Sequence, residues 1–181
     1  QLPPARAIVN PNRLDEEPGY GQLAAVGVAY LLVIACNRSL RAAGWYGPAR
    51  PEPDLMAWLD LVALGTICDV VALTGLNRAL VAQGLKVMAT RQNPGLVALS
   101  DVANLSSPPG TYHAGFVLGP RVNAGGRVGQ ADLGARLLST NDPLEAQGIA
   151  QELDRLNTER REIEAAVLAE ALEQVETTLA G

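Results

Sequence analysis

The stretch DPLEAQGIAQELDRLNTERREIEAAV, residues 142–167, decides the fold class of this protein. Asp142 is a typical N-cap, Pro143 fits the first helical position, and Glu145 completes a capping box. Apolar residues then follow at helical spacings of three, four and seven: Ile149, Leu153, Leu156, Ile163 and Val167. The pattern predicts a helix that continues to about residue 178, which is on the order of 50 Å long at 1.5 Å per residue. A helix of that length often connects two domains.

The segments before this helix are also mostly helical in pattern. Apolar residues make up 48% of the chain and aromatic residues only 4%, so the core is expected to consist of Ala, Leu and Val. Helices are expected at residues 23–44, 54–65, 77–90, 95–105 and 131–140. The first of these is apolar nearly all round, which predicts a buried helix, and Asp54 is expected to cap the second. Residues 7–10, AIVN, are expected to form a short strand that ends in a turn.

Charge and cysteine usage restrict the functional classes. The net charge is −5, but residues 142–181 hold ten acids and three arginines, so residues 1–141 carry about +2 and can still bind anions locally. Cys36 and Cys68 lie in apolar surroundings and are expected to be small core residues of a cytoplasmic protein. The single histidine, His113, lacks a partner at zinc-ligand spacing and is expected to be structural or exposed. No segment approaches the roughly 20 uninterrupted apolar residues of a membrane span.

One carboxylate, Asp69, interrupts the apolar run LVALGTICDVVALTG, residues 61–75. Single Asp residues usually bond to nearby backbone, so Asp69 is a candidate cap of a helix or turn, or a surface residue. The alternative is a carboxylate at the end of an apolar element that binds a divalent metal ion, since hard cations prefer oxygen ligands. The residues alone favour the first interpretation.

A glycine-rich segment, LGPRVNAGGRVG at residues 118–129, carries the second group of candidates. It matches neither of the common nucleotide-binding fingerprints. Its glycines would let the backbone turn tightly and approach a ligand, Arg121 and Arg127 can fork onto phosphate oxygens, and Asn123 offers both a donor and an acceptor. The equally weighted alternative is a loop between elements whose arginines pair with local acids such as Asp132.

Four segments resemble, in this order, the RecJ family of single-stranded-DNA-specific exonucleases in the DHH phosphoesterase superfamily: LPPARAIVNPNR, LDLVALGTICDVVALTGLNR, GFVLGPRVNAGGR and LDRLNTERREIE. The resemblance covers essentially the whole chain. It implies an α/β fold for the intact protein, with this chain mainly α-helical and retaining at most a short remnant of the parallel sheet. It further implies that residues 1–141 are the C-terminal part of the catalytic domain. Residues 142–181 would be the linker helix to a DHH-associated domain that is absent from this chain.

The resemblance also implies a site. Members of the family use two manganese or magnesium ions, and the aspartate of their A-L-G-T-x-x-D-V motif matches Asp69, which becomes a catalytic metal ligand. The P-R-x-N-A-x-G-R motif suits DNA phosphates and maps onto Arg121, Asn123 and Arg127. The implied reaction is 5′-to-3′ hydrolysis of single-stranded DNA in repair and recombination. With the resemblance included, the metal-ligand interpretation of Asp69 is the stronger one.

The chain lacks the D-x-D and D-H-H motifs of the family. We therefore expect an internal piece that is inactive alone, binds metal weakly and self-associates through apolar surface that the missing strands would cover. One alternative is a related phosphoesterase that acts on short oligoribonucleotides. Another is a catalytically dead homologue that serves as a replication scaffold.

Overall fold

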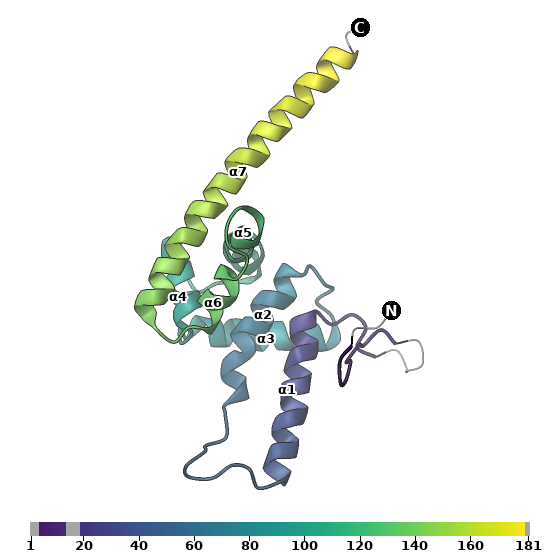
Figure 1. Ribbon diagram of the computed structural model, residues 1–181, viewed down its shortest axis with the longest axis vertical. Coiled ribbons are helices and arrows are strands. Elements are labelled where there is room, and N and C mark those ends of the chain that lie inside the picture. Colours follow the sequence, from purple (N-terminus) through teal and green to yellow (C-terminus); the bar gives the residue numbers. More distant parts are fainter. Residues whose placement is uncertain (1–3, 14–18, 180–181) are drawn as a thin grey trace. The chain divides into compact units, whose positions relative to one another are not determined.

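The computed structural model describes residues 4–13 and 19–179, and its regular structure there is helical, as expected (Figure 1). The elements are α1 (Ala25–Ala42), η1 (Leu55–Trp58), α2 (Leu59–Cys68), α3 (Gly75–Ala89), α4 (Pro94–Val102), η2 (His113–Leu118), α5 (Gly119–Val128), α6 (Leu133–Ser139) and α7 (Pro143–Leu179). They form two compact units, Gln1–Thr90 and Arg91–Gly181. The long helix belongs to the second unit, and its role as a linker to a further domain stays a prediction.

The strand expected at residues 7–10 does not form. The segment is irregular, Ile8 and Val9 are exposed, and the sole β interaction in the described residues is an isolated bridge between Gly47 and Arg50. A strand needs a partner for its backbone hydrogen bonds, and the described residues offer none. The turn that follows is present, because the Asn12 amide donates to Asn10 Oδ1 over 2.9 Å.

The first unit is built on the pairing of α2 with α3. Tyr30, Leu59, Val62 and Leu80 form its buried cluster, and the Tyr30 hydroxyl donates to the Leu55 carbonyl oxygen over 3.1 Å. The helices approach closely at Gly84, where a Cβ would lie 2.1 Å from the Leu59 carbonyl oxygen. Glycine is therefore required at that position for α3 to reach α2.

The start of the second expected helix is confirmed in part. Asp54 Oδ1 accepts the Met56 amide over 2.9 Å, which is the expected cap. The first turn is 3-10 rather than α-helical, and α2 then continues to Cys68, three residues beyond the predicted end at Gly65. The extension brings Asp69 directly to the end of the helix.

The expected burial of α1 is wrong within the described chain. Of its 18 residues only Gly27, Tyr30 and Asn37 are buried, and Cys36 is exposed rather than part of the core. A helix that is apolar on every side needs cover on every side, and the described residues cover only part of α1. By length and composition α1 is the one described helix that could cross a membrane, with a mean hydropathy of 1.3. A core helix of a soluble protein meets the same criteria.

The second unit packs α4, α5 and α6 against the first half of α7. Its fully buried residues include Leu99, Leu118, Leu137 and Leu153. Asp142 caps α7 as predicted, since its Oδ1 accepts the Leu144 amide over 2.9 Å. The predicted capping box is wrong: Glu145 accepts from the Thr140 hydroxyl over 2.6 Å, and the Asp142 amide donates to the oxygen of that same hydroxyl over 3.1 Å.

The apolar stripe of α7 is used along half of its length. Ile149, Leu153 and Leu156 are buried, whereas Ile163 and Val167 are exposed. The helix has 37 residues, and residues 161–178 are all exposed. Figure 1 shows this part of α7 extending past the other helices of the second unit. The second half of α7 therefore has an apolar stripe that no described residue covers.

Candidate functional site

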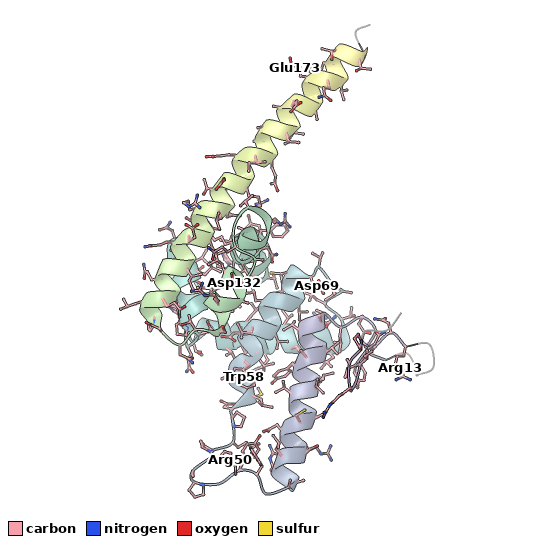
Figure 2. The ribbon with its side chains drawn as sticks, viewed as in Figure 1. Arg13, Arg50, Trp58, Asp69, Asp132 and Glu173 are labelled. Carbon is pink, nitrogen blue, oxygen red and sulfur yellow. The ribbon has the colours of Figure 1, made fainter. Side chains whose placement is uncertain are left out.

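Asp69 is the C-cap residue of α2 (Figure 2). Its backbone amide continues the helix by donating to the Gly65 carbonyl oxygen over 3.0 Å, and its side chain is exposed. Among the hydrogen bonds and ion pairs found between described residues, none uses this carboxylate. Asp69 is therefore at the surface but does not act as a side-chain cap, which leaves its oxygens open to a cation.

The electrostatic position of Asp69 is unfavourable for the helix. The carboxyl end of a helix carries partial negative charge, so a carboxylate there is repelled. The neighbouring Cys68 is affected as well, since burial of its thiol and then the charge of Asp69 raise the thiol pKa. A bound cation would relieve this accumulation of negative charge.

The residue after Asp69 holds a strained backbone. Val70 has φ of 56° and an 89% exposed side chain. The left-handed conformation is costly for a β-branched residue, and such strain tends to persist at functional sites. Arg91 and Asn104 have similar angles just after α3 and α4, so the same kind of helix end occurs three times. The valine after Asp69 is the least suited of the three residues to this conformation.

Asn77 fixes the loop that follows Asp69, a role that the sequence analysis missed. Its fully buried amide group donates to the Ala72 carbonyl oxygen over 3.0 Å and to the Gln22 carbonyl oxygen over 2.8 Å. A signal was present, because Asn77 lies four residues before Val81 on the buried face of α3. An amide on an apolar face needs partners, which here are two loop carbonyls.

The glycine-rich segment forms a helix, so neither the tight backbone turn of the anion-binding interpretation nor the loop of the alternative is present. A π-helical turn, η2, leads directly into α5, and the backbone makes no tight turn between residues 118 and 128. Gly125 serves packing, since a Cβ there would lie 2.6 Å from the Gln130 carbonyl oxygen and 3.2 Å from Leu133 Cβ. Glycine at this position therefore lets α5 approach α6 and α7 closely, even though glycine is a poor helix former.

Both arginines of α5 pair with acids, though not with Asp132. Arg121 Nε donates to Asp154 of α7 over 2.7 Å and its Nη1 donates to the Val117 carbonyl oxygen over 2.7 Å. Arg127 Nη1 lies 4.0 Å from Glu164 of the same helix. The side chain of Arg121 is 18% exposed and that of Arg127 is 59% exposed.

These contacts separate the three phosphate candidates. Arg121 spends two donors on the protein, which leaves three of the five donors of its guanidinium group. Arg127 is exposed and weakly paired, and Asn123 is exposed four residues earlier on the same face of α5. Arg127 and Asn123 are therefore the more accessible anion donors.

Asp69 lies in the first unit and Arg121, Asn123 and Arg127 lie in the second, so each group is described within its own unit. The described residues contain no cluster of three or more His, Cys, Asp or Glu side chains that could hold a metal ion. The carboxylate of Asp69 fits the role of a single oxygen ligand. A complete set would need ligands from outside the described residues.

Comparison with known proteins finds similar sequences among RecJ exonucleases. The chain is 45% identical to the single-stranded-DNA-specific exonuclease RecJ of Dickeya dadantii over 174 residues, which cover 94% of this chain and 30% of the relative. It is 43% identical to RecJ of Escherichia coli over 189 residues, with 99% of this chain and 33% of the relative covered. Its homologues are RecJ exonucleases. No protein-family model matches the chain.

Solved RecJ structures share the fold. A manganese-bound exonuclease RecJ superimposes with a TM-score of 0.69 and 38% identity, covering 82% of this chain and 35% of that protein. RecJ of Thermus thermophilus with Mn²⁺ gives 0.70 and 36% identity, covering 90% and 22%. The Mg²⁺ complex from the same organism gives 0.68 and 36% identity, covering 88% and 23%. The chain thus spans about a third or less of the RecJ proteins that it matches.

Proposed function

We propose that the full-length protein containing this chain is a metal-dependent exonuclease that hydrolyses single-stranded DNA from 5′ to 3′ in repair and recombination. The observation that carries the proposal is the similarity to RecJ exonucleases over 94% of the chain. The open carboxylate of Asp69 supports it, because folding alone gives no reason for an acid at the end of α2.

Asp69 contributes one oxygen ligand to a Mn²⁺ or Mg²⁺ centre in the proposed enzyme. Divalent ions of this kind supply a nucleophilic water at neutral pH and stabilise charge on phosphoryl oxygens. RecJ structures with Mn²⁺ and with Mg²⁺ support this choice of metals. The strained Val70 and the anchor at Asn77 hold Asp69 at the end of α2.

The donors of α5 bind the phosphates of the DNA strand in this proposal. Arg127 and Asn123 present exposed groups to the strand, and Glu164 at 4.0 Å is a weak competitor that a phosphate could displace. Arg121 holds α5 against α7 through Asp154 and offers its remaining donors. Such phosphate contacts make binding salt-dependent, with a slope set by the number of charges that are neutralised.

Residues 1–181 by themselves are proposed to have no exonuclease activity and no tight metal site, because a lone carboxylate holds a divalent ion weakly. The apolar surface of α1 and of the second half of α7 supports self-association of the isolated chain. Cys36 and Cys68 form no disulfide, which suits a cytoplasmic location. Light scattering that shows a clean monomer at high concentration would contradict the proposed association.

The decisive experiment compares the full-length protein with residues 1–181 in Mn²⁺. Both are incubated with single-stranded DNA labelled at either end, with the matching duplex and with a dinucleotide. We expect the full-length protein to release nucleotides from the 5′ end of single-stranded DNA, and the isolated chain to release none. Preference for the dinucleotide would favour a related phosphoesterase, and inactivity of the full-length protein on every substrate would favour a scaffold.

A further inference from the structure

Two aromatic side chains are exposed beside the anion-binding helix. Tyr112 is 65% exposed and Phe116, the single phenylalanine of the chain, is 74% exposed. Their rings stack on each other with centroids 5.3 Å apart and planes inclined by 27°. In a chain whose aromatic content is 4%, a stacked pair left in water calls for a reason beyond the core.

The pair is held rigidly. Phe116 lies in η2, and Tyr112 is the residue directly before η2. Ala114 and Leu118 of η2 are fully buried. His113 contacts Tyr112 edge to face, with centroids 5.9 Å apart, while its Nδ1 accepts the Gly110 amide over 3.0 Å. The rings therefore sit on a helical backbone that is anchored by buried neighbours, so no backbone ordering is needed when a ligand binds.

The pair and the phosphate candidates lie on one continuous helical segment, the π-helical η2 followed by α5. Asn123 and Arg127 follow Phe116 by seven and eleven residues, which is about two and three helical turns. Both are exposed. At about 1.5 Å per residue the aromatic pair and Arg127 are on the order of 16 Å apart along the axis, enough for a few nucleotides between them.

We propose that Tyr112 and Phe116 form a stacking platform for the bases of the single strand whose phosphates contact Asn123 and Arg127. The inference rests on the proposed exonuclease function and adds to it a base-binding site. Aromatic faces accept every base, so the platform holds the strand without reading its sequence. Exposed rings and exposed phosphate-binding donors on one helical segment suit single-stranded DNA, whose charged backbone carries flat bases.

The test measures DNA affinity of the full-length protein by fluorescence anisotropy in EDTA, which prevents cleavage. The probes are a poly-dT oligonucleotide and an abasic oligonucleotide of the same length. We expect Phe116→Ala to weaken poly-dT binding about ten-fold and Tyr112→Ala to weaken it by a similar factor. Binding of the abasic probe stays unchanged in both variants, and Tyr112→Phe and Phe116→Trp retain wild-type affinity.

Leu144→Ala is the matched control, because Leu144 is 84% exposed on α7 and its removal tests the loss of an exposed apolar side chain alone. It should change neither affinity. An equal loss of affinity for the poly-dT and abasic probes, or no loss of affinity in Phe116→Ala, would overturn the platform. The proposed function would still stand in either case if the wild-type protein cleaves DNA. A Phe116→Ala protein with a lowered melting temperature and unchanged affinity would show that the ring packs on protein. Absence of wild-type binding to poly-dT would overturn the platform, whereas absence of wild-type DNA cleavage in Mn²⁺ would overturn the proposed function.

Discussion

The two ends of α2 each carry an aspartate, in opposite surroundings. Asp60, in the first turn, is only 3% exposed and accepts the Leu61 amide over 2.7 Å, where the helix dipole favours a negative charge. Burial raises its pKa. Asp69, at the other end, is exposed, and the dipole opposes its charge. The helix dipole and the Leu61 amide favour a carboxylate at Asp60, although burial opposes its charge. Neither the dipole nor a side-chain hydrogen bond favours one at Asp69, and this contrast is why we propose a functional role for Asp69.

Asp69→Asn in the full-length protein should have the largest effect in this comparison. We expect exonuclease activity in Mn²⁺ to fall by about 100-fold or more, because the proposed metal ligand loses its charge. Stability in EDTA should rise by about 0.3–1 kcal/mol, since a repelled charge leaves the helix end. Electron paramagnetic resonance of bound Mn²⁺ and thermal unfolding measure the two effects. Asp132→Asn removes an exposed acid of the second unit and should change neither (Figure 2).

Asn77→Ala should loosen the loop behind Asp69. The variant loses hydrogen bonds to two loop carbonyls, which predicts a loss of about 2–3 kcal/mol in the free energy of unfolding together with weaker Mn²⁺ binding. Urea unfolding and Mn²⁺ titration measure both. Asn93→Ala removes a comparable amide group that accepts the Leu96 amide over 3.0 Å in the second unit. Asn93→Ala should lose stability and keep its affinity for Mn²⁺. An equal loss of Mn²⁺ affinity in the two variants would contradict the role of Asn77.

Asp60→Asn should show the reverse of Asp69→Asn, a change in stability with no change in chemistry. The raised pKa means that the folded chain keeps a proton that the unfolded chain releases, so stability falls as pH rises from the ordinary Asp pKa towards the raised value. The neutral amide removes this loss. We expect a gain on the order of 1 kcal/mol at pH 7 that disappears below about pH 4, from thermal unfolding across the pH range.

Val70→Gly should give the smallest effect. Relief of left-handed strain gains about 1–2 kcal/mol, and the added freedom of the unfolded glycine removes about 0.4–1 kcal/mol of it, so the net gain is about 0.5 kcal/mol. Val70→Asn should also stabilise, as the natural Asn104 suggests. Val70→Ile keeps the branched Cβ and should leave the melting temperature unchanged. A gain in the isoleucine variant would rule out strain as the cause.

The helix boundaries were predictable where one residue specifies them. Asp54 and Asp142 cap their helices because their own carboxylates reach the next backbone amides. The segment around Gly125 was misassigned, because glycine there serves a close approach between helices that only the packed structure reveals. The strand at residues 7–10 failed for a related reason, since a strand depends on a partner that its own residues do not specify.

For the candidate site, the sequence predicted which types of residue to consider but not the contacts that they make. The position of Asp69 at the end of an apolar element followed from the sequence, but the strain at Val70 follows from backbone angles alone. The pairing of Arg121 with Asp154 joins residues 33 positions apart, so local spacing pointed to Asp132 instead. The resemblance to RecJ identified these residues, and the structure added which of their donors remain open.

The half-packed α7 predicts a gradient of amide hydrogen exchange along a single helix. Amides near Leu153 lie in a buried core and open only with the second unit, so they should exchange slowly. Amides between Ile163 and Val175 are protected by helix formation alone, which is marginal in water, and should exchange far faster. Any surface that covers the second half of α7 would lengthen those exchange times residue by residue. Amide exchange in the second half of α7 would therefore show directly whether another surface packs against it.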